Sequence, residues 1–302
     1  MAVSMGKLRI TVGPVPYLWD GPKWRDFYFR LADCAAIDAV TLGEVVCSKR
    51  DHFVRPFTDA VVERLLAAGK EVAQATLALV TLDRERQATR QVVQSSSLVE
   101  ANDLSALAML AGRPHHVGPF VNVYNAPTAA LLGRQGARRI CLGAELPASS
   151  LASITAGAPG LEYELVAFGR LPLAMSARCA HARAKGHTKD NCKFVCGEDP
   201  DGLDVDTLDR QAFLTINGVQ TMSRHCQALI GDLEMLGRIG ITHLRLSPQD
   251  CDMVAVAEMF AQVRDGALGA DEGLGQLRDI YPAAHFSNGF LHGAPGMDWV
   301  AA

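Results

Sequence analysis

Three cysteines lie close together in one polar segment of the chain, and a fourth lies far upstream. Cys179, Cys192 and Cys196 are spaced C-x12-C-x3-C, whereas Cys47 stands alone in the segment 43–50. Thiolates grouped in this way typically hold a metal ion or an iron–sulfur cluster. Three unrelated free thiols in a polar loop would be open to oxidation. The spacing therefore predicts a site that binds metal through sulfur.

Zinc is the main alternative to an iron–sulfur cluster. Structural zinc sites commonly use paired C-x2-C motifs, and no such pair occurs in the sequence. His181 and His187 could join a zinc site, but a loop position suits solvated histidines equally well. Spacing alone thus favours iron–sulfur without excluding zinc. The other four cysteines are expected to be buried, small apolar residues; they are Cys34, Cys141, Cys226 and Cys251.

Composition and charge exclude several classes of protein. The 302 residues carry a formal net charge of −4, so no basic surplus indicates a nucleic-acid partner. No apolar run is long enough to cross a bilayer, which argues against an integral membrane protein. The N-terminus does not resemble a signal peptide. We therefore expect a cytoplasmic protein, whose thiols stay reduced and do not form a disulfide framework.

Short β-rich runs alternate with helical stretches along the chain, which indicates parallel strands joined by helical crossovers. Eight such units predict a TIM-barrel-like (β/α)8 fold of the α/β class. A doubly wound open sheet is the alternative, but the turn after the first strand, Gly13-Pro-Val-Pro, lacks the glycine-rich nucleotide motif. The expected strands are residues 8–13, 39–43, 71–80, 97–100, 116–124, 139–142, 161–168 and 243–246.

The chain is expected to form one domain, residues 1–302, with one long insertion at about 176–209 after the seventh strand. That insertion carries three of the grouped cysteines. An additional strand is expected at 212–216. Among the helices, 58–68 is predicted to begin at Thr58 as its N-cap, and 227–239 is predicted to be strongly helical.

In a barrel of this kind, the loops that follow the strands meet at one mouth, where functional residues gather. Cys47 follows the second strand and the other three cysteines follow the seventh, so one site at the mouth is expected. Arg245 could hold a carboxylate bidentately, and Asn122 and Tyr124 are expected on one face of the fifth strand. The polar residues expected near the strand ends are Glu44, Thr76, Glu100, Asn122, Tyr124, Glu145, Arg245 and Ser247; the candidate pocket is taken as Glu44, Asn122, Tyr124 and Arg245.

Several segments also resemble a known family. The chain is similar, along nearly its whole length, to the ubiquinone-biosynthesis members of the collagenase-like peptidase family (U32). The cysteine spacing agrees with that branch as well. The segments that carry the resemblance are residues 42–50, 75–80, 100–103, 122–126, 171–179, 217–223 and 245–249.

The resemblance implies a [4Fe–4S] cluster bound by Cys47, Cys179, Cys192 and Cys196. It also implies a heterodimer with a UbiU-like protein, a lipid-binding UbiT-like protein as a further partner, and ring hydroxylation of a ubiquinone precursor without dioxygen. Prephenate is the expected oxygen donor. Four cysteine ligands leave no open iron on a simple cubane, so electron transfer or a structural role is expected. A zinc-stabilised scaffold or a peptidase is the alternative, although no nucleophile–base pair or zinc-protease motif stands out.

Overall fold

A closed barrel of parallel strands forms the centre of the protein. The computed structural model describes residues 8–301. Within this part of the chain the strands pair in the order β1-β2-β3-β4-β5-β6-β7-β11, and β11 also pairs with β1 to close the ring. The predicted (β/α)8 barrel is confirmed. Its strands are β1 (Arg9–Val12), β2 (Ala39–Leu42), β3 (Glu71–Ala75), β4 (Val99–Ala101), β5 (His115–Val117), β6 (Ala137–Cys141), β7 (Glu162–Met175) and β11 (His243–Leu246).

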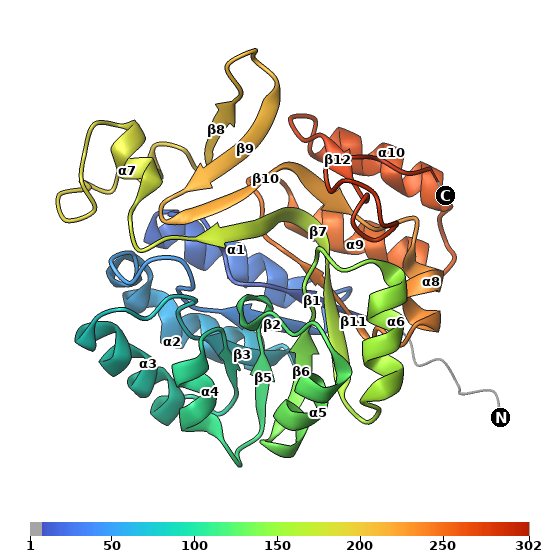
Figure 1. Ribbon diagram of the computed structural model, residues 1–302, viewed down its shortest axis with the longest axis horizontal. Helices are drawn as coiled ribbons and strands as arrows, with labels where there is room; N and C mark the ends of the chain where they lie inside the picture. Colours follow the sequence, from blue (N-terminus) through green and yellow to red (C-terminus); the bar gives the residue numbers. More distant parts are fainter. Residues whose placement is uncertain (1–7, 302) are drawn as a thin grey trace.

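Helices follow the strands and cover the outside of the barrel (Figure 1). Their alternation with the strands gives parallel pairing, because each helix returns the chain to the same end of the barrel. Within residues 8–301, no helix combines the length and apolar character needed to cross a membrane. The helices of this layer are α1 (Gly21–Asp33), α2 (Asp51–Ala67), α3 (Asp83–Ser95), α4 (Leu104–Leu110), α5 (Ala126–Arg134), α6 (Ala148–Gly157), α8 (Leu233–Arg238), α9 (Met253–Arg264) and α10 (Ala270–Ile280).

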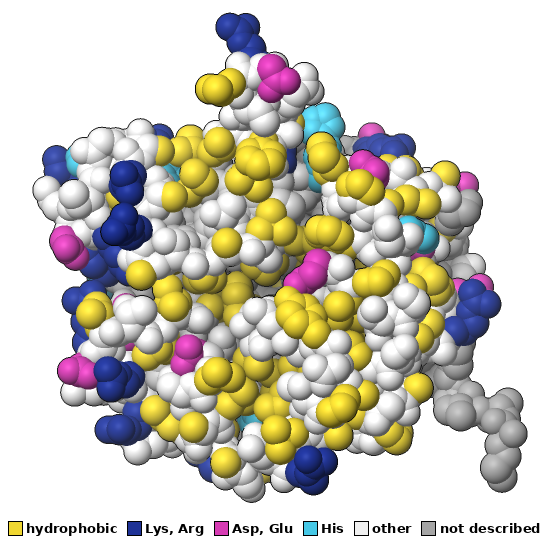
Figure 2. Space-filling view, viewed as in Figure 1, with side chains coloured by type: hydrophobic (Ala, Val, Ile, Leu, Met, Phe, Trp, Pro, Cys, Tyr) yellow, Lys and Arg dark blue, Asp and Glu magenta, His cyan; other side chains and the backbone are white. Residues whose placement is uncertain are grey.

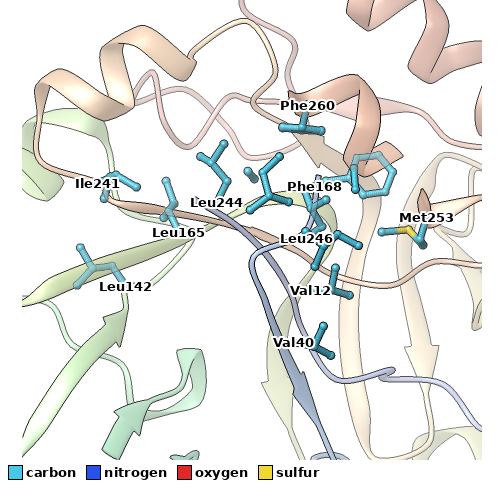
Figure 3. Packing of buried hydrophobic residues seen from close by; sticks show 14 of the residues in the cluster. Val12, Val40, Leu142, Leu165, Phe168, Ile241, Leu244, Leu246, Met253 and Phe260 are labelled. Atoms are coloured by element: carbon cyan, nitrogen blue, oxygen red, sulfur yellow. The ribbon is translucent and has the colours of Figure 1, made fainter. Parts of the chain in front are cut away.

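The main hydrophobic core lies between the barrel and this helical layer. Alternate residues of each strand point outward, so Leu244 and Leu246 of β11 face helix α9 (Figure 3). Phe168 of β7 and Phe260 of α9 pack with their ring centroids 6.3 Å apart. Burying a side chain of this size stabilises the fold by about 1.5–3 kcal/mol. The apolar strand positions therefore hold the helices against the barrel.

The inside of the barrel is polar. Arg245 of β11 reaches Glu100 of β4 with two hydrogen bonds, Nη1 to Oε2 at 2.6 Å and Nη2 to Oε1 at 3.0 Å. The same Nη1 donates to Glu164 Oε2 of β7 at 2.9 Å, and Thr11 Oγ1 donates to Glu164 Oε1. All four residues are buried. Because β4 and β11 are not neighbours, this buried ion cluster joins strands across the interior.

A second set of charges surrounds Arg139 of β6. Its guanidinium lies 2.8 Å from Glu71 Oε1 of β3 and 2.9 Å from Glu162 Oε2 of β7. His243 of β11 is buried and lies 3.9 Å from Glu162. The charges around Arg139 and those around Arg245 together fill interior positions of the barrel. In most such barrels, apolar side chains occupy these positions.

Strand β7 continues well past the barrel and begins a second, antiparallel part of the sheet. It pairs with β10 (Gln220–Ala228), β10 pairs with β9 (Ala212–Asn217), and β9 pairs with β8 (Leu203–Asp206). The hairpin of β8 and β9 rises above the end of the barrel (Figure 1). The additional strand expected at 212–216 corresponds to β9. After β10 and helix α8, the chain returns to the barrel at β11. The short strand β12 (Phe286–Ser287) comes later in the chain and pairs with β10.

The prediction that Thr58 caps a helix is wrong. Helix α2 begins at Asp51, so Thr58 lies in its second turn, where its hydroxyl donates to Val54 O at 3.2 Å. Pro56 lies within this helix. Pro56 is the sixth residue of the helix, so its missing N–H removes one intrahelical hydrogen bond, the one to the carbonyl four residues earlier.

The prediction of one helix over residues 227–239 is also wrong. Strand β10 extends to Ala228, and helix α8 covers only Leu233–Arg238. Gln227 and Ala228 pair with Gly169 and Phe168 of β7. Pairing with a distant strand thus overrides the local helical pattern.

Replacing Arg245 by Met should destabilise the protein by about 3–5 kcal/mol, because Glu100 and Glu164 would remain buried without a counter-charge. Urea unfolding at pH 7.5 measures this. The matched control is Arg55→Met, because Arg55 is exposed and its ion pair among the described residues is with Asp51 of its own helix. That change should have little effect. Equal effects of the two substitutions would contradict a structural role for the buried ion cluster.

Stability should fall in two stages as pH decreases. Burial and then Arg139 lower the pKa of His243 from 6.5 to about 4, so the unfolded chain takes up the proton first and stability falls over this range. Burial opposes ionisation of Glu164, but Arg245 outweighs it and lowers the pKa of Glu164 from 4.5 to about 2. That contribution is present above pH 4.5 and is lost towards pH 2. The free energy of unfolding, measured by urea titration at several pH values between 7.5 and 4, should depend less steeply on pH for His243→Gln than for the unchanged protein. An equal dependence on pH would contradict the first stage.

Candidate metal centre and the adjoining pocket

The four grouped cysteines line one small pocket at the mouth of the barrel. Cys47 comes from the loop between β2 and α2. Cys179 is the N-cap of the short helix α7 (Ala180–Ala184), and Cys196 lies in the 3₁₀ turn Val195–Gly197. Cys192 lies in the loop between them. The structure therefore brings together the upstream cysteine and the three late ones.

Backbone conformation directs the three late cysteines inward. Ala182 N donates to Cys179 Sγ at 3.3 Å, which fixes that sulfur at the start of α7. Lys193 and Phe194 both adopt left-handed conformations, with φ of 49° and 56°. Such conformations are uncommon outside glycine. They reverse the chain between Cys192 and Cys196, so that both line the same pocket.

Contacts between the insertion and the β2–α2 loop hold the two cysteine-bearing segments together. Lys49, two residues after Cys47, donates from Nζ to Lys189 O at 2.6 Å. Phe194 packs edge-on against Phe53 of α2, with ring centroids 5.0 Å apart. One polar and one aromatic contact thus join the segments on either side of the pocket.

Arg50 is a buried positive charge beside the sulfurs. It donates from Nη1 to Pro16 O and from Nη2 to Asn217 Oδ1, both at 2.8 Å. Burial raises the pKa of the Cys196 thiol, and Arg50 acts in the opposite direction. Among the described residues, Arg50 Nε has no hydrogen-bond partner although it is buried. A guanidinium with a spare donor is suited to a site that carries negative charge.

Glu44 orients the loop of Cys47 and does not line the cysteine pocket itself. Its Oε1 accepts hydrogen bonds from the backbone N–H groups of Val46 and Cys47, both at 2.8 Å. Burial raises the pKa of Glu44, and burial followed by the neighbouring Glu44 raises the pKa of Cys47.

His181 is buried, so the interpretation of this residue as a solvated loop histidine is wrong. Its Nε2 lies 2.9 Å from Asp199 Oδ2, and its Nδ1 accepts from Gly218 N at 3.4 Å. These contacts tie the helix of Cys179 to the turn between β9 and β10. Burial lowers the pKa of His181, which favours the neutral ring. The C-x-H spacing of Cys179 and His181 was the available sequence signal for this role.

The four thiols are suitable ligands for a metal bound through sulfur, although the pocket that they line is small. The pocket holds about 20 Å³, roughly the room of one water molecule. Within residues 8–301, no group of three or more His, Cys, Asp or Glu side chains is arranged to hold a metal ion. Either a zinc ion or a larger cluster would therefore require the insertion to adjust. Four thiols are the ligand set of a [4Fe–4S] cluster, and the unpartnered donor of Arg50 agrees with the charge of such a group.

A second, larger pocket of about 330 Å³ lies beside the cysteine pocket. Asn122 and Tyr124 line it, but the expectation that they share a face of the fifth strand is wrong. Strand β5 ends at Val117, and Asn122 follows a 3₁₀ turn in a left-handed conformation with φ of 59°. Tyr124 donates its hydroxyl hydrogen to Glu145 Oε1. Glu145 lies in the loop after β6.

Arg245 does not belong to either pocket. Its two terminal nitrogens, Nη1 and Nη2, both donate to the carboxylates of Glu100 and Glu164 inside the barrel. The expectation that Arg245 binds the carboxylate of a ligand is therefore wrong, because the partners are carboxylates of the protein itself. Arg50 was not among the predicted site residues, although it lies only three residues after Cys47 in the sequence.

Comparisons with known proteins give a family for the chain and several solved structures of low similarity. The family model described as Peptidase family U32 matches residues 28–301. A truncated form of 3-deoxy-D-arabino-heptulosonate 7-phosphate synthase from Thermotoga maritima is 8% identical, with a TM-score of 0.37, and the match covers 93% of this chain and 89% of that one. An uncharacterised protein is 10% identical, with a TM-score of 0.38, covering 89% and 71% of the two chains.

Mild oxidation of the metal-free protein with diamide should produce disulfides only among Cys47, Cys179, Cys192 and Cys196, because these sulfurs share one pocket. Peptide mapping by mass spectrometry identifies the pairs. The buried Cys226 should stay reduced in the folded protein and should react only after unfolding. If every disulfide detected joins two of Cys179, Cys192 and Cys196, and none contains Cys47, the shared pocket is contradicted.

Proposed function

The chain belongs to peptidase family U32, and from this premise we propose that it is an iron–sulfur subunit of the UbiV type. In this proposal it supports ring hydroxylation of a ubiquinone precursor in the absence of dioxygen, together with a UbiU-like partner. The observation that carries the proposal is the convergence of Cys47, Cys179, Cys192 and Cys196 on one pocket. The cysteine spacing and the sequence resemblance of the UbiV type support it further.

The four cysteines would hold a [4Fe–4S] cluster, which supplies one-electron transfer when it is bound. Arg50 contributes a buried positive charge that favours thiolates over thiols. Glu44 fixes the backbone at Cys47 through two hydrogen bonds. His181 and Asp199 position the helix that begins after Cys179. Each surrounding residue therefore has a part in holding a sulfur ligand.

Four thiolates would occupy the outer position of every iron in a simple cubane. The proposed role is therefore electron transfer or structural support, with the oxygen donor, expected to be prephenate, bound elsewhere. A lipid-binding UbiT-like protein is a further proposed partner, because a ubiquinone precursor carries a long apolar tail. We place the complex in the cytoplasm.

The alternatives are a zinc-stabilised scaffold and a peptidase. A scaffold would use the same thiols for zinc, and the small space in the cysteine pocket suits one ion better than a cluster. The family description names peptidases. A hydrolytic metal, however, needs an open coordination position, which a four-cysteine site lacks.

Protein purified without oxygen should be brown and should contain about four irons and four sulfides per chain. Replacing any one of the four pocket cysteines by Ala should remove most of the iron, because each thiolate supplies one ligand. Iron and sulfide analysis with visible absorption measures this outcome. The Cys→Ala variants should lose the cluster but stay folded, so their far-ultraviolet circular dichroism spectra should match that of the unchanged protein.

Two matched substitutions serve as controls. Cys141→Ala alters a buried cysteine of β6, and Cys251→Ala alters a partly exposed one; both should keep their iron. Iron loss in either control would contradict the ligand assignment. Colourless protein with one zinc per chain would support the scaffold instead.

A further inference from the structure

The pocket of about 330 Å³ beside the cysteines has walls that suit a flat apolar ring. Phe120, Val166, Leu171, Met175 and Phe290 line it, together with prolines and alanines. A volume of this size lies at the lower end of those that hold small molecules. Figure 2 shows hydrophobic side chains gathered across the centre of this face of the molecule, while lysine and arginine lie mainly along its left edge.

The polar groups of this pocket favour a neutral hydrogen-bond donor. Its polar lining consists of the Asn122 amide, the Tyr124 hydroxyl and the Glu145 carboxylate, and the described residues around it include no lysine, arginine or histidine. A carboxylate without a neighbouring cation repels an anionic ligand and accepts strongly from an uncharged O–H or N–H. The pocket is therefore selective against carboxylates and phosphates, and selective for a ligand with a hydroxyl or a similar donor.

The geometry around Glu145 leaves one oxygen available. Tyr124 donates to Oε1. Burial and the hydrogen bond to Glu145 raise the pKa of Tyr124 to about 12, so this hydroxyl stays protonated and remains a donor. Glu145 Oε2 lies near Gly143, where a Cβ atom would approach it to 3.0 Å. Among the described residues, Tyr124 bonds only to Oε1 of this carboxylate, and Oε2 has no hydrogen bond of its own.

The pocket is open at one side and borders the cysteines at another. Tyr124 and Leu173 are each 45% exposed, so a substituent on the ring could extend outward past them. Phe120 and Met175 line the pocket and also pack against the cluster of buried residues that includes Cys179. These two side chains therefore lie between the pocket and the buried residues around Cys179.

We propose that this pocket binds a neutral, flat ring bearing a hydroxyl group, which donates its hydrogen to Glu145 while Phe120, Met175 and Phe290 enclose the ring. A phenol with an alkyl or prenyl substituent has this chemistry. The binding specificity follows from the pocket alone, whereas the identity of the bound ring as the one to be hydroxylated rests on the proposed function.

Three matched probes test the proposal by calorimetric titration at pH 7.5. They are 4-propylphenol, its methyl ether 4-propylanisole, and the anion 4-propylbenzoate. The phenol should bind at least about tenfold more tightly than the ether, as expected for a hydrogen bond to a charged group. The benzoate should bind most weakly. Equal binding of phenol and ether, tighter binding of benzoate, or no binding of any probe would overturn the proposal.

Variants assign the preference to Glu145. Glu145→Gln should reduce the preference for phenol over ether to a few-fold and should strengthen benzoate binding, because the negative charge is removed. The control Glu272→Gln changes an exposed residue of α10 and should leave all three affinities unaltered. An unchanged preference in Glu145→Gln would overturn the assignment.

The same preparations separate this inference from the proposed function. Iron content is measured on each sample before titration. Intact iron without phenol selectivity would overturn the pocket assignment and leave the cysteine site standing. Phenol selectivity in protein that never holds iron would support the pocket and contradict the iron–sulfur proposal.

Discussion

The contact of Arg245 with Glu100 and Glu164 is the interaction on which the barrel depends. It joins β11 to β4 and β7 across an interior where other such barrels pack apolar side chains. Charges removed from water are tolerated only with close, well-aligned partners. The spacing of these strands is therefore narrowly defined, and so are the loops that leave them at the mouth. Both pockets draw on β7 and the segment that follows it: residues 171–175 line one, and Cys179, Cys192 and Cys196 line the other.

The cysteine pocket and the larger pocket of about 330 Å³ lie next to each other, and their side chains suit two different kinds of ligand. Thiols and a buried guanidinium suit a sulfur-bound metal, whereas Glu145 and aromatic walls suit an uncharged ring. Phe120 and Met175 belong to the border of both. Such proximity is what electron transfer between a metal centre and an organic molecule requires, because the two must lie close without sharing ligands.

The periodicity of the sequence was sufficient to predict the barrel, because each strand and each crossover helix produces its own local pattern of apolar residues. The grouping of the cysteines also followed from order along the chain, since loops after strands meet at one end. Other features depended on distant partners. Gln227 is extended only because β7 lies beside it, and Arg245 is unavailable to ligands only because two glutamates converge on it. Asn122 left its expected strand because a 3₁₀ turn follows Gly118.

Strand β7 has one further consequence for how the two pockets are connected. A single hydrogen-bonded segment of 14 residues starts inside the barrel, supplies Leu171 to Met175 as a wall, and ends four residues before Cys179. The same strand therefore lines the larger pocket and leads directly into the loop that carries three of the four pocket cysteines. Residues 175–179 are the shortest stretch of chain that connects the two sites.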